Sequence, residues 1–103
     1  MPWIFLTFAG LLEIVWAVAL KQSHGFTRLT PSLVMVTAMA ASLALLALAM
    51  RSLPLGTAYM IWTGIGAVGA FICGVLLFGE AVTGLRIAAA TLIVAGMIMM
   101  KIA

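Results

Sequence analysis

The sequence contains very few charged side chains, with five Lys or Arg and two Asp or Glu among 103 residues. Soluble globular domains carry about 25% charged residues, whereas this chain carries 7% and is 67% hydrophobic. Such a deficit excludes a water-soluble domain. The composition therefore indicates an integral membrane protein.

Reactive and metal-binding side chains are equally scarce. A single cysteine, Cys73, excludes an intramolecular disulfide and lies in an apolar run, as expected of a small buried hydrophobe. The one histidine, His24, lies in a predicted loop, and no nucleophile has a base at a suitable spacing. We therefore expect no enzyme activity, metal or cofactor.

The basic residues stand singly at predicted helix ends, as membrane-interface anchors do, so we expect no nucleic-acid partner.

Four apolar runs account for most of the chain. A transmembrane helix needs about 20 apolar residues, and the runs predict helices at about residues 3–20, 32–50, 57–78 and 85–100. The first run contains Glu13 and lacks a positive leader, which favours a retained helix over a signal peptide. Short loops make neighbouring helices antiparallel. Residues 1–103 are therefore expected to form one all-α, four-helix transmembrane domain with both termini on the same side.

The basic residues leave the orientation of the chain in the membrane unspecified. With cytoplasmic termini, Arg51 and Lys101 lie inside, and the α-amino group would bring their count level with the three outer residues, Lys21, Arg28 and Arg86. A chain without charge bias can insert both ways, and two opposed copies would resemble an inverted-repeat transporter. The count favours a dual-topology homodimer, and the alternative explanation is the noise of so small a count.

Glu13 is the one charged residue predicted to lie within the bilayer. A carboxylate at mid-membrane costs about 2.5–3.5 kcal/mol on insertion scales, so its presence indicates a function. Burial disfavours the charged form of a carboxyl group, which suits Glu13 to carry a proton near neutral pH. The alternative is a protonated glutamate that only forms hydrogen bonds between helices.

Aromatic and hydroxyl side chains are expected to surround Glu13. Gly10 and Ala17 share its helix face, where small residues let a helix or a ligand come close. Indole, phenol and hydroxyl groups can fix a carboxyl rotamer and wall a site for an organic cation. The candidates are Trp16, Ser42, Tyr59 and Trp62. Singly, the aromatic residues would be typical of the membrane interface; together around one acid they favour a binding site.

Two further sets of small residues predict helix contacts. Gly64, Gly66 and Gly69 in the third predicted helix allow close packing and a bend, which would suit a moving gate. Static helix packing explains their spacing equally well. In the fourth predicted helix, Ala89 and Gly96 lie seven apart on one face. That spacing is compatible with a dimer contact, with lipid exposure as the alternative.

One protomer is expected to be insufficient for transport. Four helices pack around side chains without leaving a hydrated path, and one acid per chain indicates a paired site in a dimer. Two Glu13 side chains facing one cavity disfavour simultaneous ionisation. They would hold protons or one small organic cation, but not both. Such exclusive occupancy is what a proton-coupled antiporter needs.

Three motifs carry a family resemblance. They are E-I-V-W-A-V-A-L-K at residues 13–21, G-F-T-R-L-T-P-S at 25–32 and P-L-G-T-A-Y-M-I-W-T-G-I-G-A at 54–67. Over essentially its whole length the sequence resembles the small multidrug resistance family. Trp16, three residues after the acid, and the W-T-G-I-G-A segment are similar to the guanidinium exporter subtype. Met60 departs from the family pattern, in which alanine is usual.

The resemblance implies a proton-coupled exporter of guanidinium, an antiparallel dual-topology homodimer among the lipids of the bacterial inner membrane. Small substituted guanidinium or quaternary ammonium ions are further candidate substrates. The resemblance implies alternating access with Glu13 of both protomers as the shared proton and substrate site. It places Ser42 and Trp62 as hydrogen-bonding neighbours, and Trp16 and Tyr59 as the rest of the pocket. The last helix would carry the dimer contact and the glycines of the third helix the kink.

Other functions remain as alternatives. A multidrug exporter of bulkier quaternary ammonium cations would use the same fold, although Trp16 narrows the site. A non-transporting membrane subunit or part of a lipid flippase would need a partner chain or a basic headgroup site, where this chain has an acid. One half of a paired heterodimer would need a clear charge bias.

Overall fold

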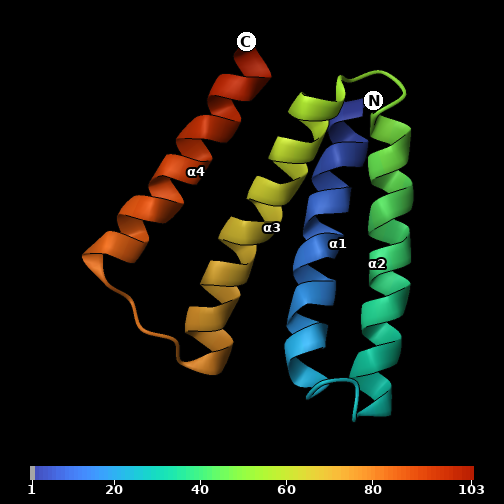
Figure 1. Ribbon diagram of the computed structural model, residues 1–103, viewed down its shortest axis with the longest axis vertical. Helices are drawn as coiled ribbons and strands as arrows, with labels where there is room; N and C mark the ends of the chain where they lie inside the picture. Colours follow the sequence, from blue (N-terminus) through green and yellow to red (C-terminus); the bar gives the residue numbers. More distant parts are fainter. Residues whose placement is uncertain (1) are drawn as a thin grey trace.

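The computed structural model describes residues 2–103, so Met1, the first residue of the predicted domain, lies outside it. The described chain forms four helices joined by short loops, without a β-strand (Figure 1). The helices are α1 (Pro2–Gln22), α2 (Leu29–Ala49), α3 (Leu55–Phe78) and α4 (Gly84–Ile102). Each is long and apolar enough to cross a membrane. The predicted all-α architecture of four apolar helices is confirmed.

Helix α2 begins at Leu29, three residues before the start predicted from the proline. Pro31 lies in its first turn, where a proline removes only an N–H group that would have no partner within the helix. The Ser32 N–H donates to the Arg28 carbonyl at 3.2 Å. The Ser32 hydroxyl donates to the same carbonyl at 2.5 Å. The helix can therefore begin two residues before the proline.

The loop between α1 and α2 is organised by Ser23, which is fully buried. Its hydroxyl donates to the Leu20 carbonyl at 2.7 Å and accepts the Phe26 N–H at 3.1 Å. His24, Gly25 and Phe26 all have positive φ angles, which non-glycine residues adopt uncommonly. These bonds hold a tight reversal that returns α2 alongside α1 (Figure 1).

Helices α1, α2 and α3 meet in a core of small and aliphatic residues. Its buried members are Leu6, Ala9, Leu46, Ala49, Ala58, Ile61 and Trp62. The alanines at positions 9, 49 and 58 have no exposed surface, so the helix backbones come close at these points. Helix α1 packs against both α2 and α3 and is therefore the centre of the three-helix layer.

Helix α4 lies beside α3 and leans away from α1 and α2 (Figure 1). None of its described residues is buried. Near its end the Lys101 ammonium lies 5.1 Å from the centre of the Trp3 ring, a cation–π contact with the first turn of α1. Both chain ends consequently lie at the same end of the bundle (Figure 1).

Close packing of α1 on α3 depends on Gly10. A Cβ atom at this position would lie 2.5–2.9 Å from side-chain atoms of Ile65, including its Cβ. Because Ile65 branches at that atom, it cannot move aside without moving α3. We expect Gly10→Ala to lower the unfolding free energy by about 1–3 kcal/mol through overpacking, measured as a lower Tm of the detergent-solubilised protein.

Gly56→Ala is the matched control for this substitution. Gly56 lies in the first turn of α3 with nothing within 4 Å of an added Cβ, and alanine has the higher helix propensity. Its Tm should equal or exceed that of the unchanged protein. The same Tm for both variants would contradict the close contact at Gly10.

Candidate functional site

Glu13 lies in the middle of α1, and its carboxyl group rests on α3 at Gly66. A Cβ atom at Gly66 would collide with all three atoms of that carboxyl group. The missing side chain at position 66 therefore creates the space that the carboxyl group occupies. Glu13 is half-buried, and its Oε2 is a buried atom without a hydrogen-bond partner among residues 2–103.

Trp16 lies one turn further along α1 and has the same property. Its Nε1 is buried and has no hydrogen-bond partner in the described chain. A buried polar atom without a partner costs about 1–3 kcal/mol, and α1 carries two of them within one turn. The Glu13 Oε2 and the Trp16 Nε1 are thus an acceptor and a donor that could each form one further hydrogen bond.

Ser42 and Trp62 are brought together in the core by a hydrogen-bond chain. The Trp62 Nε1–H of α3 donates to the Ser42 Oγ of α2 at 3.0 Å. The Ser42 hydroxyl donates to the Ala9 carbonyl of α1 at 2.6 Å. Ser42 is fully buried and Trp62 nearly so. The chain of bonds ties three helices together one turn before Glu13, using the α1 backbone and not the carboxyl group.

Tyr59 extends this arrangement toward the outer surface of α3. Its ring centre lies 5.4 Å from that of Trp62, and the ring planes are tilted by 57°, a favourable geometry for an aromatic pair. Half of the Tyr59 surface is exposed. The phenol therefore stands at the edge of the site and the indole of Trp62 at its base.

The three glycines predicted as a kink all lie at helix contacts. Gly64 faces Met97 of α4, Gly66 faces Glu13, and Gly69 faces Ile14 of α1. A side chain at any of these positions would collide with its neighbour. Helix α3 is continuous from Leu55 to Phe78, so close packing is the role this conformation displays, and the kink stays a prediction.

The residues predicted for the dimer contact lie on the uncovered helix. Ala89 is exposed and Gly96 is half-buried, and a Cβ atom at Gly96 would meet nothing within 4 Å. Both positions are therefore open to another chain or to lipid, and their role stays a prediction. Among residues 2–103, no three His, Cys, Asp or Glu residues come together as a metal site would require.

Two features of the site were not identified from the sequence. One is Gly66 as the seat of the Glu13 carboxyl group, and the other is the Ala9 carbonyl as the acceptor for Ser42. The matched small residues of α1 and α3 were a signal of their close packing, but only the alignment of the two helices identifies which residues meet. A backbone carbonyl carries no side-chain signal at all.

Comparison with known proteins gives a consistent result. The sequence model of the family described as Small Multidrug Resistance protein matches residues 1–94. The chain is 63% identical to the guanidinium exporter of Escherichia coli O6:H1, 62% to that of Escherichia coli K12 and 61% to that of Salmonella typhimurium. Each match spans 102 residues, 99% of this chain and 97% of the relative. These relatives are named as exporters and not as enzymes.

The hydrogen-bond chain predicts a coupled loss of stability. Ser42→Ala leaves the Trp62 Nε1–H buried without an acceptor, so we expect a loss of about 1–3 kcal/mol in unfolding free energy. Once Trp62→Phe has removed the donor, Ser42→Ala should cost markedly less. Denaturant unfolding of the two single variants and the double variant measures this coupling. Simple additivity would show that the bond contributes nothing.

Proposed function

The chain belongs to the small multidrug resistance family, and on that premise we propose that it exports guanidinium in exchange for protons. It is a multi-pass membrane protein of four apolar helices. Relatives that cover nearly its whole length are named guanidinium exporters. The observation that carries the proposal is the half-buried Glu13 carboxyl group, which lies against α3 and whose buried Oε2 has no hydrogen-bond partner among residues 2–103.

Guanidinium suits this carboxyl group chemically. The ion is planar, and two of its N–H groups match the two oxygens of a carboxylate. Aromatic faces attract such a cation. Trp16 follows Glu13 by one turn on α1, Trp62 precedes Gly66 by one turn on α3, and Tyr59 pairs with Trp62. The hydrogen bond to Ser42 holds the indole of Trp62 in place. The indole can therefore contact the cation without first changing its conformation.

Coupling follows from competition for Glu13. A protonated carboxyl group is neutral and cannot pair with guanidinium, whereas a guanidinium-bound carboxylate cannot take up a proton without releasing the cation. When two Glu13 side chains share one cavity, binding of protons and binding of guanidinium exclude each other more strongly. The reason is that adjacent negative charges disfavour ionisation of both carboxyl groups at once. Alternating exposure of such a site to the two membrane faces exchanges protons for guanidinium.

We place this site in an antiparallel, dual-topology homodimer. One carboxyl side chain within the helices of each protomer, balanced basic residues and a fourth helix without a buried residue support that assembly. Ala89 and Gly96 of α4 would meet the partner copy, and the α3 glycines would allow the bend that opens one side of the cavity. Relatives from Escherichia coli and Salmonella support a bacterial inner membrane location.

Glu13→Gln tests the exchange directly. The amide neither titrates nor carries a negative charge, so we expect guanidinium-driven proton movement in proteoliposomes to disappear. Glu13→Asp, which keeps the carboxylic acid, should retain exchange at a reduced rate. Glu13→Gln, which has the same shape, should keep the assembly and Tm of the unchanged protein, because Oε2 has no hydrogen bond to lose among residues 2–103. Normal exchange by Glu13→Gln would disprove the assignment.

The same vesicles separate guanidinium export from the multidrug alternative. Guanidinium, methylguanidine and tetraalkylammonium ions of increasing size form the substrate panel. Because Trp16 lies one turn from Glu13 and narrows the site, the planar ions should be exchanged fastest. Weak guanidinium exchange beside robust transport of large aromatic or quaternary cations would favour the multidrug function.

Dual topology predicts how the chain ends are labelled. Both ends lie at the same end of the bundle (Figure 1), so a tag at either terminus should be labelled from both faces of the membrane in intact cells and inverted vesicles. A single-topology membrane protein of known orientation serves as the control. Labelling from one face only would exclude an antiparallel homodimer of this chain.

A further inference from the structure

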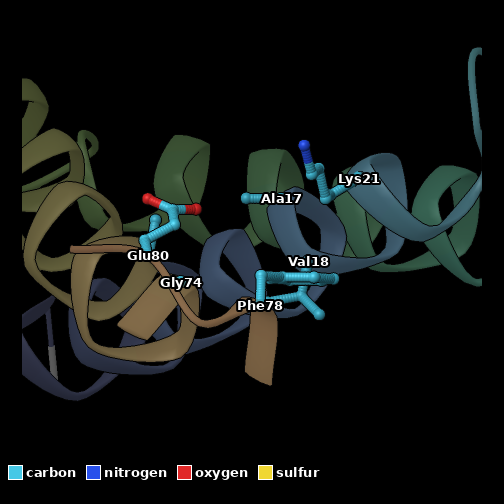
Figure 2. Close-up of a pocket in the computed structure, with 7 residues that line it drawn as sticks. Ala17, Val18, Lys21, Gly74, Phe78 and Glu80 are labelled. Atoms are coloured by element: carbon cyan, nitrogen blue, oxygen red, sulfur yellow. The ribbon is translucent and has the colours of Figure 1, made fainter. Parts of the chain in front are cut away.

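A second charged site lies between α1 and α3, close to the end of both helices (Figure 2). It is a pocket of about 130 Å³ whose lining includes Ala17 and Lys21 of α1, Gly74 and Phe78 of α3, and Glu80 of the following loop. One water molecule needs only about 10–15 Å³ of such space. The pocket, here called the outer pocket, therefore has room for a small hydrated ion.

The outer pocket is in line with Glu13 along the contact between the two helices. Ala17 and Lys21 follow Glu13 at four-residue steps and so share its face of α1. Ala70, which also lines the pocket, follows Gly66 by one such step on α3. Because Glu13 rests on Gly66 and Ile14 on Gly69, α1 and α3 stay in contact between the acid and the pocket. The outer pocket therefore begins one helical turn beyond the Glu13–Gly66 contact, along the same pair of helices.

The backbone at the end of α3 directs Glu80 back over the helix. Gly79 has a φ of 66° and ends α3 in the left-handed conformation, which glycine adopts without strain. The Glu80 N–H then donates to the Gly74 carbonyl at 3.1 Å. The Glu80 carboxyl group lies against Gly74, where an added Cβ atom would be 2.7–2.9 Å from it. The acid is thus held at the pocket by the fold.

The electrostatics of the outer pocket favour a cation. Helix C-termini carry a partial negative charge, which basic residues normally offset. Helix α1 has Lys21 in its last turn, whereas the last turn of α3 has no basic residue and is followed by Glu80. The end of α3 therefore adds to the negative charge of the acid. Lys21, the one basic residue of the lining, opposes both.

We propose that the outer pocket is a transient cation site, in which Glu80 binds guanidinium or another small monovalent organic cation on its path to or from Glu13. Lys21 keeps this binding weak, because a transport path requires each site to release its ion. The proposal rests on the proposed guanidinium export and adds a second substrate contact to it.

Guanidinium exchange in proteoliposomes at several ionic strengths tests the outer pocket. Glu80→Gln should raise the KM for guanidinium by about three- to tenfold and leave kcat nearly unchanged, because it removes local attraction and not the coupling acid. The rise of KM with added salt should also become smaller, since an exposed charge is screened. The substitution leaves the Lys and Arg count, and hence the insertion signal, unaltered.

Three further variants separate charge from structure. Lys21→Gln should lower KM, whereas Arg51→Gln, the same charge change in the α2–α3 loop, should leave it unchanged. Because both variants alter the Lys and Arg count, each is compared after labelling of its termini shows the topology of the unchanged protein. Glu80→Asp keeps the charge and should restore most of the affinity lost in Glu80→Gln. A purely structural role for Glu80 would not give opposite effects for the two charges of one pocket.

The outcomes distinguish the two proposals. If the unchanged protein exchanges guanidinium and Glu80→Gln has the same KM and salt dependence, the outer pocket is not a cation site. A loss of kcat at constant KM in Glu80→Gln would also overturn it. If the unchanged protein does not exchange guanidinium at all, the proposed function itself fails. If Glu80→Gln does not fold, Lys21→Gln decides the question. A KM for guanidinium in Lys21→Gln that is not lower than that of the unchanged protein then overturns the proposal.

Discussion

The contact between the Glu13 carboxyl group and Gly66 is the constraint on which the rest of the structure depends. An acid can be held between two membrane helices only where one of them has no side chain, and Gly66 provides that place. Gly10 and Gly69 allow the same close approach on either side of it, facing Ile65 and Ile14. Three glycines thus let α1 and α3 pack closely around one carboxyl group.

Around this contact the polar groups divide into two kinds. Ser42 and Trp62 have every close partner they require and join three helices through the Ala9 carbonyl. The Glu13 Oε2 and the Trp16 Nε1, one turn away, have none in the described chain. The satisfied groups hold the three helices together, and the unsatisfied groups keep hydrogen-bonding capacity for a substrate. A transporter needs both, because it must bind a cation firmly enough to recognise it and still release it.

Composition and turn residues were sufficient to predict four apolar helices. Glu13 could be identified because it is the one charged residue predicted to lie within the bilayer. The start of α2 was placed too late, because Pro31 lies in a first turn that tolerates proline. For Gly66 the sequence left a kink and close helix packing as alternatives, because a sequence shows that a glycine is small but not what fills its space. The seat of Glu13 and the acceptor of Ser42 depend on how helices far apart in the sequence are aligned, and helical periodicity contains no such information.

Helix α4 buries no residue in its own protomer, and this has a consequence for how the sequence can change. Substitutions on the other helices must preserve a buried core, whereas most positions of α4 face lipid or a partner chain, apart from contacts such as Met97 with Gly64 and Lys101 with Trp3. In the proposed dimer each change on α4 occurs twice, once in each orientation. Two gene copies could therefore diverge first along this helix, becoming obligate partners while both retain the same three-helix core.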